Sequence, residues 1–271
     1  MAKKPVITEY EITSPKIKET MTIAHVSDIH ERNMDDIIVL LKTVKPDMIA
    51  VSGDTFERYS EDSSRAGVLP GYNVIRRGIV WVIYFINCVL MKTFYRKNQP
   101  DTGFAYAFFQ KASKIAPVYL SLGNHDEALE PQDLQVLKEN GITLLDNAEI
   151  LAAVRQNRLY IGGLSTDYDR DWLQHFSEHS GFKLLLSHHP EYFEPVILPR
   201  DIDLTLSGHN HGGQIKLFGR GVMSAEKKLF PKLDSGFFFN RLVVSAGCCN
   251  TAAIPRWGNP CELVVIHLKP Q

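Results

Sequence analysis

The sequence has few cysteines and no spacing that would join them into a framework. It contains four of them among 271 residues, Cys88, Cys248, Cys249 and Cys261. No two form a CxxC pair, and the pattern of a small disulfide-rich domain is missing. We therefore expect reduced thiols in an intracellular protein.

Long hydrophobic runs and export signals are also missing. The N-terminal stretch has no apolar core of a secretory signal and no twin-arginine signal. The most apolar run, residues 79–91, is shorter than the ~20 residues that a spanning helix needs, and Asn87 interrupts it. Basic residues flank the run, as in helices that lie in a membrane interface: Arg76, Arg77, Lys92, Arg96 and Lys97. Residues 74–97 therefore fit either a buried core helix or peripheral contact with a membrane, and we expect a cytoplasmic protein.

An excess of charge and several phosphate-handling or nucleophilic motifs are missing as well. The formal net charge is -1, so no general attraction to nucleic acid is expected. No Gly-Lys dipeptide occurs, which excludes a Walker A loop, and no G-x-S-x-G elbow occurs, which excludes an acyl-serine hydrolase.

Short apolar runs alternate with helical patterns along most of the chain. This alternation predicts an α/β fold. Helices are predicted over residues 34–44, with Asn33 as N-cap, and over residues 131–140 and 169–179. The predicted strands cover residues 22–27, 47–52, 117–122, 158–163, 182–187, 203–208, 241–246 and 262–268.

Residues 60–103 do not follow this alternation. They begin with the polar stretch SEDSSRAG and continue into the apolar run. We interpret the chain, residues 1–271, as a single domain in which residues 60–103 are an insertion that forms a cap or a membrane-interface segment.

Side chains that can bind metals follow five of the predicted strands. Ligands of open α/β sheets bind beyond the carboxyl ends of the strands, and these five ends carry Asp, His and Asn side chains. The residues are Asp28, His30, Asp54, Asn124, His125, Asp126, His188, His189, His209 and His211.

The spacing of these residues indicates a metal centre. In an extended backbone residues i and i+2 point the same way, so Asp28 and His30 would reach one ion together, with Ile29 in the core, and His209 and His211 would form a second such pair. Gly53, Gly123 and Gly208 each precede a candidate, which allows close backbone approach. The ligands outnumber those of one tetrahedral zinc site. They fit two divalent ions ~3.5–4 Å apart, with Asp54 as the bridge because it stands alone at its strand end.

At this point the sequence resembles the calcineurin-like metallophosphoesterase family. The blocks DIH (28–30), GDTFE (53–57), GNHD (123–126), His188 and GHNH (208–211) occur in the order of that family's signature. The resemblance covers roughly residues 21–268, and five blocks in order are far more specific than one DxH. It implies a four-layer α/β/β/α sandwich with the site at the strand ends.

The resemblance also implies roles for individual residues. One metal site would use Asp28, His30, Asp54 and His211, and the other Asp54, Asn124, His188 and His209. His188 rather than His189 is chosen from the family pattern alone.

Other residues near these ligands receive weaker expectations. His125 would contact the phosphate and the leaving group, and Asp126 would either orient it or be structural. Glu57 would bond a ligand histidine or cap a turn. Arg32 would bind a phosphate oxygen or form a surface salt bridge. Cys248 and Cys249 are interpreted as packed residues.

The function implied is a metal-dependent phosphoric ester hydrolase. Its cofactors would be two divalent ions, manganese, iron, zinc or magnesium, with manganese favoured. The GHNHGGQI and IPRWGNPCEL stretches are similar to the bacterial branch that includes envelope-type enzymes and UDP-2,3-diacylglucosamine pyrophosphatases. This favours a phosphoester or pyrophosphate of a lipid-linked or nucleotide-sugar compound. A nucleotide phosphodiesterase or nuclease on the same site, and a catalytically silent protein-binding scaffold, are the alternatives.

Overall fold

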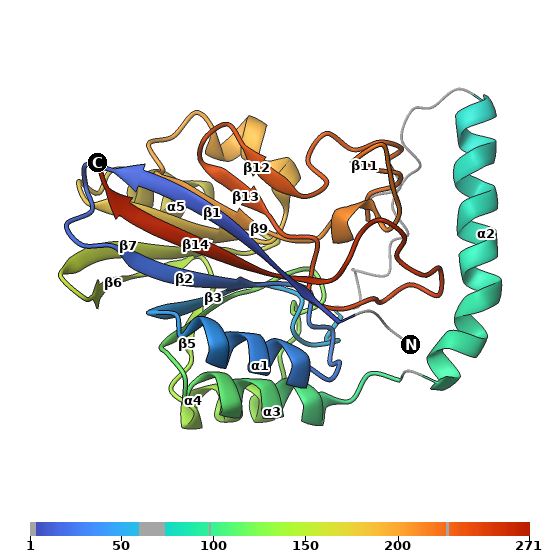
Figure 1. The fold of residues 1–271 in the computed structure, drawn as a ribbon, viewed down its shortest axis with the longest axis horizontal. Coiled ribbons are helices and arrows are strands. Elements are labelled where there is room, and N and C mark those ends of the chain that lie inside the picture. The colour runs from blue at the N-terminus through green and yellow to red at the C-terminus, as the bar shows by residue number, and fades with distance from the viewer. Residues whose placement is uncertain (1–3, 60–73, 98, 226–227) are drawn as a thin grey trace.

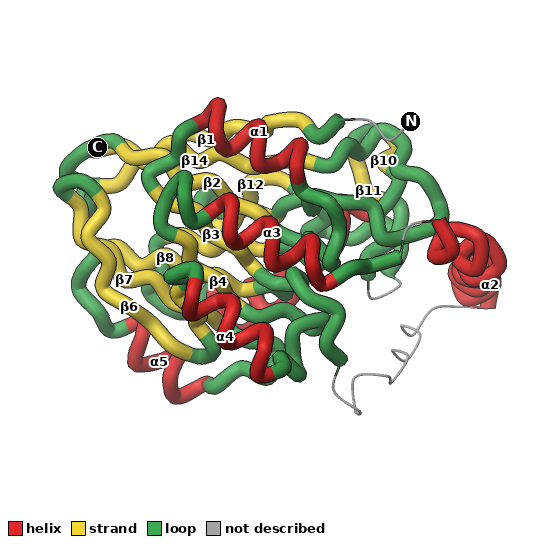
Figure 2. The backbone as a smooth tube through the Cα atoms, turned by 90° about the horizontal axis from the view of Figure 1, so that it is seen from below, coloured by secondary structure: helices red, strands yellow, loops and turns green. Residues whose placement is uncertain are grey.

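The computed structural model contains two six-stranded sheets that pack face to face. It describes residues 4–59, 74–97, 99–225 and 228–271. The first part of the predicted insertion, residues 60–73, therefore lies outside the described residues. Figures 1 and 2 show the sheets in the middle of the molecule, with helices on their outer sides.

The first sheet has the strand order β1-β14-β2-β3-β4-β5. The pairs among β2, β3, β4 and β5 are parallel, while β14 runs antiparallel to β2. Parallel neighbours place their carboxyl ends at one edge, which is where the polar blocks follow. The strands are β1 (Val6–Ser14), β2 (Met21–Val26), β3 (Met48–Ser52), β4 (Val118–Ser121), β5 (Thr143–Leu145) and β14 (Glu262–Pro270).

The second sheet has the order β12-β13-β9-β8-β7-β6. Its central strands, β7, β8, β9 and β13, are parallel to one another. A separate two-stranded hairpin is formed by β10 (Lys216–Leu217) and β11 (Arg220–Gly221). The strands of the sheet are β6 (Ala148–Val154), β7 (Asn157–Leu164), β8 (Phe182–Ser187), β9 (Leu204–Ser207), β12 (Gly236–Phe238) and β13 (Leu242–Val244).

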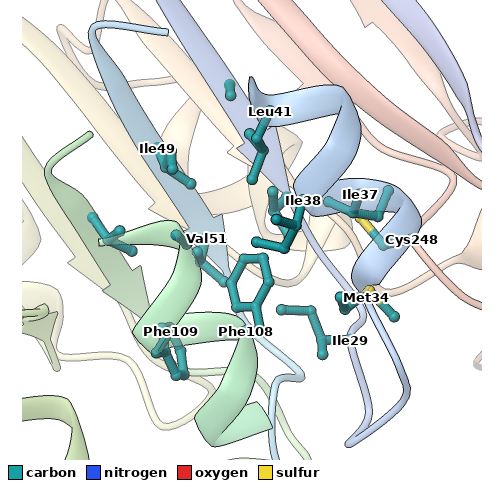
Figure 3. Packing of buried hydrophobic residues seen from close by; sticks show 14 of the residues in the cluster. Ile29, Met34, Ile37, Ile38, Leu41, Ile49, Val51, Phe108, Phe109 and Cys248 are labelled. Carbon is teal, nitrogen blue, oxygen red and sulfur yellow. The ribbon is translucent and has the colours of Figure 1, made fainter. Parts of the chain in front are cut away.

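Three apolar clusters hold the four layers of the molecule together. One lies between the sheets and includes Ile23, Val264 and Leu184. The second joins α1 (Asp35–Val44), α3 (Thr102–Ala112) and α4 (Pro131–Glu139) to the outer face of the first sheet. Figure 3 shows its centre, where Phe108 and Ile38 meet Val51. The third packs α5 (Arg170–Ser177) and a π-helical turn, Phe193–Ile197, on the second sheet. The four-layer α/β/β/α sandwich is thus the observed fold.

The helix α2 (Val74–Lys97) does not join these layers. Both views place it beside one end of the sandwich, next to the β10–β11 hairpin (Figures 1 and 2). The prediction of a buried core helix over residues 79–91 is wrong, because Trp81, Phe85 and Val89 are exposed. Among the described residues, no helix combines the length and the apolar character needed to cross a membrane.

Candidate metal centre

Five strand ends bring their polar residues to one place. β2, β3, β4, β8 and β9 are each followed by one of the predicted blocks, and hydrogen bonds between loops hold the blocks together. The amide of His30 donates to the carbonyl of Asp54 at 2.9 Å, and the amide of Gly208 donates to the carbonyl of His188 at 3.1 Å. The side chains of Asp28, Asp54 and His188 are almost completely buried.

The backbone at several candidate ligands is not extended, although the pairing of residues i and i+2 at one ion was predicted from an extended backbone. Five candidate ligands have positive φ, a region that residues other than glycine rarely adopt. The angles are 57° for Asp28, 50° for His30, 53° for Asp54, 71° for His209 and 46° for His211. Such conformations gather at functional sites, where the surrounding structure maintains them.

The first group of possible ligands contains Asp28, His30 and His211, whose ligand atoms all lie within 4.8 Å of one another. The Oδ1 atom of Asp28 is 3.9 Å from His30 Nε2 and 3.5 Å from His211 Nε2. Ile29, between Asp28 and His30, is fully buried as predicted.

The second group contains Asp54, His188 and His209. His188 Nε2 lies 3.0 Å from Asp54 Oδ2 but makes no hydrogen bond to it. Its Nδ1 atom lies 2.7 Å from the Ser52 carbonyl oxygen. A proton on Nδ1 makes this bond, so Nε2 can offer its lone pair to a cation once it is deprotonated, which is the usual arrangement of a metal-binding histidine. His189 is also buried, but it bonds Thr166 and Glu191 instead.

Asp54 lies between the two groups. Its Oδ2 atom is 3.0 Å from His188 Nε2 and 3.6 Å from His30 Nε2, so one carboxylate faces both sides. The expectation that His209 and His211 pair at one ion is wrong, because His211 joins Asp28 and His209 joins Asp54.

Three buried atoms of this centre have no hydrogen-bond partner among the described residues. They are His30 Nε2, His188 Nε2 and Asn124 Oδ1. A buried polar atom without a partner costs free energy. An amide oxygen and the deprotonated Nε2 atoms of imidazoles are ligands that suit divalent transition metals, so the residues present fit a pair of cations.

Burial and neighbouring carboxylates divide the histidines into two kinds. Burial alone would lower the pKa of His30, but Asp28, Glu57 and Asp54 outweigh it and raise the pKa to about 10. Burial is likewise outweighed by Asp54 at His188, whose pKa rises to about 9. At His209 and His211 burial prevails and lowers the pKa to about 3. Without cations, His30 and His188 therefore carry a proton on both ring nitrogens at neutral pH, and a cation at Nε2 would displace one of the two.

His125 lies at the edge of the centre, with a quarter of its side chain exposed. Its Nε2 atom is 3.9 Å from Asp54 Oδ2. Its Nδ1 atom is 3.1 Å from Glu57 Oε2 and 2.6 Å from the Tyr59 hydroxyl. Glu57 also accepts from His30 Nδ1 at 3.0 Å, so of the two roles expected for it the contact with a ligand histidine is the one observed. Sequence analysis missed Tyr59, for which no motif gave a signal.

Asp126 does not orient His125 in this structure. Its carboxylate accepts hydrogen bonds from the amides of Phe56 at 2.7 Å and of Thr55 and Gly123 at 3.0 Å. It therefore fastens the loop after β3 to the loop after β4. The structural alternative for Asp126 is the one that its contacts support.

Two glycines confirm the expected close approach of the loops. A Cβ atom at Gly123 would lie 2.2 Å from Asp54 Oδ1, and one at Gly208 would lie 1.7 Å from Ser27 Oγ. No side chain fits at either position, so the glycines let Asp54 and Asp28 reach their places.

Several neighbours complete the surroundings. Arg256, from the IPRWGNP stretch, lies 3.1 Å from His211 Nδ1, and sequence analysis had not assigned it a role. Cys248 and Cys249 are buried, and burial raises the pKa of both thiols, so they behave as packed residues. Arg32, two residues after His30, is half-buried.

Comparison with known proteins identifies the family. The model of the calcineurin-like phosphoesterases matches residues 21–213. The chain belongs to this family. Members of this family generally bind a dinuclear divalent metal site.

Two curated relatives come from Bacillus subtilis strain 168. The uncharacterized metallophosphoesterase YkoQ is 28% identical over 211 residues, which are 73% of this chain and 63% of that protein. The uncharacterized protein YpbG is 25% identical over 219 residues, 78% of this chain and 68% of that protein. The chain thus spans about two thirds of the length of these relatives.

Solved structures of low sequence identity are also similar. The Mycobacterium tuberculosis phosphopantetheinyl hydrolase PptH aligns with a TM-score of 0.39 at 10% identity, over 69% of this chain and 82% of that one. The Thermus thermophilus sulfate thiohydrolase SoxB aligns with a TM-score of 0.46 at 13% identity, over 92% of this chain and 56% of that one.

Proposed function

We propose that this protein is a dinuclear-metal phosphoesterase that hydrolyses a phosphoester or pyrophosphate of a lipid-linked or nucleotide-sugar compound. The proposal rests chiefly on one observation: the Nε2 atoms of His30 and His188, which have no hydrogen-bond partner among the described residues, both lie beside the Asp54 carboxylate. It takes residues 1–271 as one domain with residues 60–103 as an inserted cap, acting in the cytoplasm with peripheral membrane contact.

The proposed metal ligands follow the two groups. Asp28, His30, Asp54 and His211 would hold one cation, and Asp54, Asn124, His188 and His209 the other. Manganese is favoured over iron, zinc and magnesium for this mixture of carboxylate, imidazole and amide. Two bound cations would neutralise the charge on the phosphoryl group and activate a water molecule for in-line attack.

The chain's own residues supply the remaining chemistry. His125 is at the exposed edge beside Asp54, where an imidazole can protonate the departing oxygen. Glu57 and Tyr59 fix its ring through Nδ1, which points Nε2 inward. Arg32 is proposed to bind a phosphate oxygen of the substrate.

A substrate screen with added manganese tests the function. Aryl phosphate monoesters, aryl phosphodiesters, nucleotide-sugar pyrophosphates and lipid phosphates would be compared on the intact chain. Turnover that disappears with chelator supports the proposal. Preference for cyclic nucleotides or nucleic acid would assign the site to a nucleotide phosphodiesterase or nuclease. Bound metal without turnover of any ester would indicate a silent scaffold.

A further inference from the structure

The outward side of α2 is apolar. Five apolar residues are spaced alternately four and three positions apart, which places them on one face of the helix: Ile75, Ile79, Val82, Ile86 and Val89. All five are exposed, Ile75 by 74%. Trp81 and Phe85 widen this face on one side, and Trp81 is 60% exposed. A surface helix normally turns its apolar side inward. This helix instead turns an apolar face toward solvent.

Three of the side chains that the structure describes in α2 turn toward the sandwich. Val80 is fully buried, while Ile83 and Asn87 are half-buried. These three positions lie on the side of the helix opposite Val82 and Phe85. The apolar character of the outer face therefore does not serve the contact between α2 and the sandwich.

Charge distinguishes a membrane from a second copy as the partner of this face. The sequence of α2 contains no acidic residue, and its basic residues precede or follow the apolar run. A helix dimer would place charges of both signs beside a narrow apolar seam. A wide apolar face with aromatic side chains and basic ends suits the surface of a bilayer with anionic lipids.

A groove runs between α2 and the segment that follows His211. Ile83 and Ile86 form one wall, and Ile215, Val222, Met223 and Ile254 form the other. Its volume is about 140 Å³. An apolar cavity of about 150 Å³ can hold a molecule the size of benzene, so the groove has room for a short stretch of hydrocarbon.

The groove lies between the outer face of α2 and a segment that neighbours a candidate ligand in the chain. Ile86 belongs both to the exposed face and to the wall of the groove. Gly213 and Gln214, at the other side, are two and three residues after His211 in the chain. A hydrocarbon chain in the groove would thus keep an attached phosphate near the candidate ligands.

We propose that α2 rests on an anionic membrane surface and that the groove receives one hydrocarbon chain of a membrane-resident phosphoester. The second part rests on the proposed phosphoesterase function, and the first does not. A lipid-linked phosphate is then the substrate class, and the nucleotide-sugar alternative requires an acyl group that enters the groove.

Vesicle sedimentation tests the membrane surface. The intact protein should sediment with phosphatidylcholine vesicles that contain phosphatidylglycerol, and Val82→Asp should weaken this binding by at least about tenfold. Val39→Asp, which makes the same change at an exposed valine of α1, should bind like the native protein. Equal binding by both variants, or loss of self-association in Val82→Asp without any vesicle binding by the native protein, would overturn the proposal.

Chain-length dependence tests the groove. With p-nitrophenyl esters of methyl, butyl and octyl phosphate and added manganese, KM should fall at least about tenfold from methyl to butyl. Ile83→Trp, which fills the groove, should remove this dependence, while Ile79→Trp on the outer face should keep it. A flat series in the native protein would contradict the groove proposal. Absence of turnover with every ester would instead refute the phosphoesterase function. The membrane-surface proposal would still be decided by the vesicle experiment alone.

Discussion

The Nδ1 atom of His188 donates to the backbone carbonyl of Ser52, the last residue of β3, at 2.7 Å. This bond crosses from the second sheet to the first, and it aims Nε2 of His188 at the centre rather than at solvent. The two sheets are thereby linked at the point where Asp54 begins the next loop. The metal ligands proposed for one cation consequently come from both halves of the sandwich.

Removing the central carboxylate should remove both cations. Asp54 faces His30 on one side and His188 on the other, so Asp54→Ala is expected to lower bound metal and to reduce turnover by at least about a thousandfold. His209→Ala should have a similar effect on turnover. Elemental analysis beside kinetics is the measurement, with circular dichroism to verify folding. Full metal content in Asp54→Ala would contradict the bridging role.

His125→Ala should separate metal binding from catalysis. Its imidazole is at the exposed edge, and the proposed cations have other ligands, so metal content should stay near the native value. Turnover should fall by about a hundredfold to ten-thousandfold, the usual size of a general-acid effect. An aryl ester with a very acidic leaving group should lose less, because that oxygen needs no proton. An unchanged rate would remove the proposed role.

Glu57→Gln should affect both imidazoles at once. The carboxylate accepts from His30 Nδ1 and approaches His125 Nδ1, and loss of such outer contacts typically costs about tenfold to a hundredfold in metal affinity or activity. Tyr59→Phe removes the contact with His125 and the hydroxyl's bond to Glu57 Oε2, and it leaves the bond between His30 Nδ1 and Glu57 Oε1 in place. We therefore expect Tyr59→Phe to lower the rate and to leave metal affinity unchanged. Metal affinity that falls equally in both variants would contradict the view that Glu57 supports metal binding and Tyr59 does not.

Metal binding should release protons at neutral pH. The pKa of His30 is raised to about 10 and that of His188 to about 9 in the protein without cations. Each proposed Nε2–metal bond displaces a proton, so affinity should increase as pH rises toward these values and decrease as pH falls. Titration calorimetry in buffers of different ionisation enthalpy should count up to about two protons. A count of zero would show that the two imidazoles are already neutral.

Asp126→Asn should weaken the fold more than a surface substitution does. The carboxylate accepts three backbone amides from two loops, and an amide group in its place would face one of these donors with its own N–H. We expect a loss of about 2–4 kcal/mol in the free energy of unfolding. Urea unfolding measures it. Unchanged stability with an altered pH profile of turnover would restore the orienting role for His125.

The strand ends were the most predictable part of the molecule. Where an apolar run stops at Asp, Asn or His, the polar residue marks the end of the strand. The observed limits of β2, β3, β4, β8 and β9 are within a residue or so of the predicted ones. By contrast, β1 and α3 were missed. β1 pairs at the sheet edge and alternates exposed with half-buried residues, which gives a weak apolar pattern. In α3 the aromatic and alanine-rich sequence TGFAYAFFQKA has little amphipathic periodicity.

The arrangement within the site was less predictable, because it depends on backbone angles that spacing does not encode. Asp28 and His30 do share a group, but His209 and His211, at the same spacing, do not. The partners of His125 show a similar limit. Glu57 and Tyr59 reach it from a different loop, whereas Asp126, its neighbour in sequence, turns to backbone amides.

The left-handed backbone at five candidate ligands lowers the stability of the fold without cations. These residues are Asp28, His30, Asp54, His209 and His211. Each such residue costs about 1–2 kcal/mol relative to the right-handed conformation, and the total is comparable to the stability of a whole domain. Cations bound only to the folded chain would offset this cost by mass action. In a metal-starved cell the polypeptide would then become vulnerable to proteases, and enzyme abundance would follow metal supply.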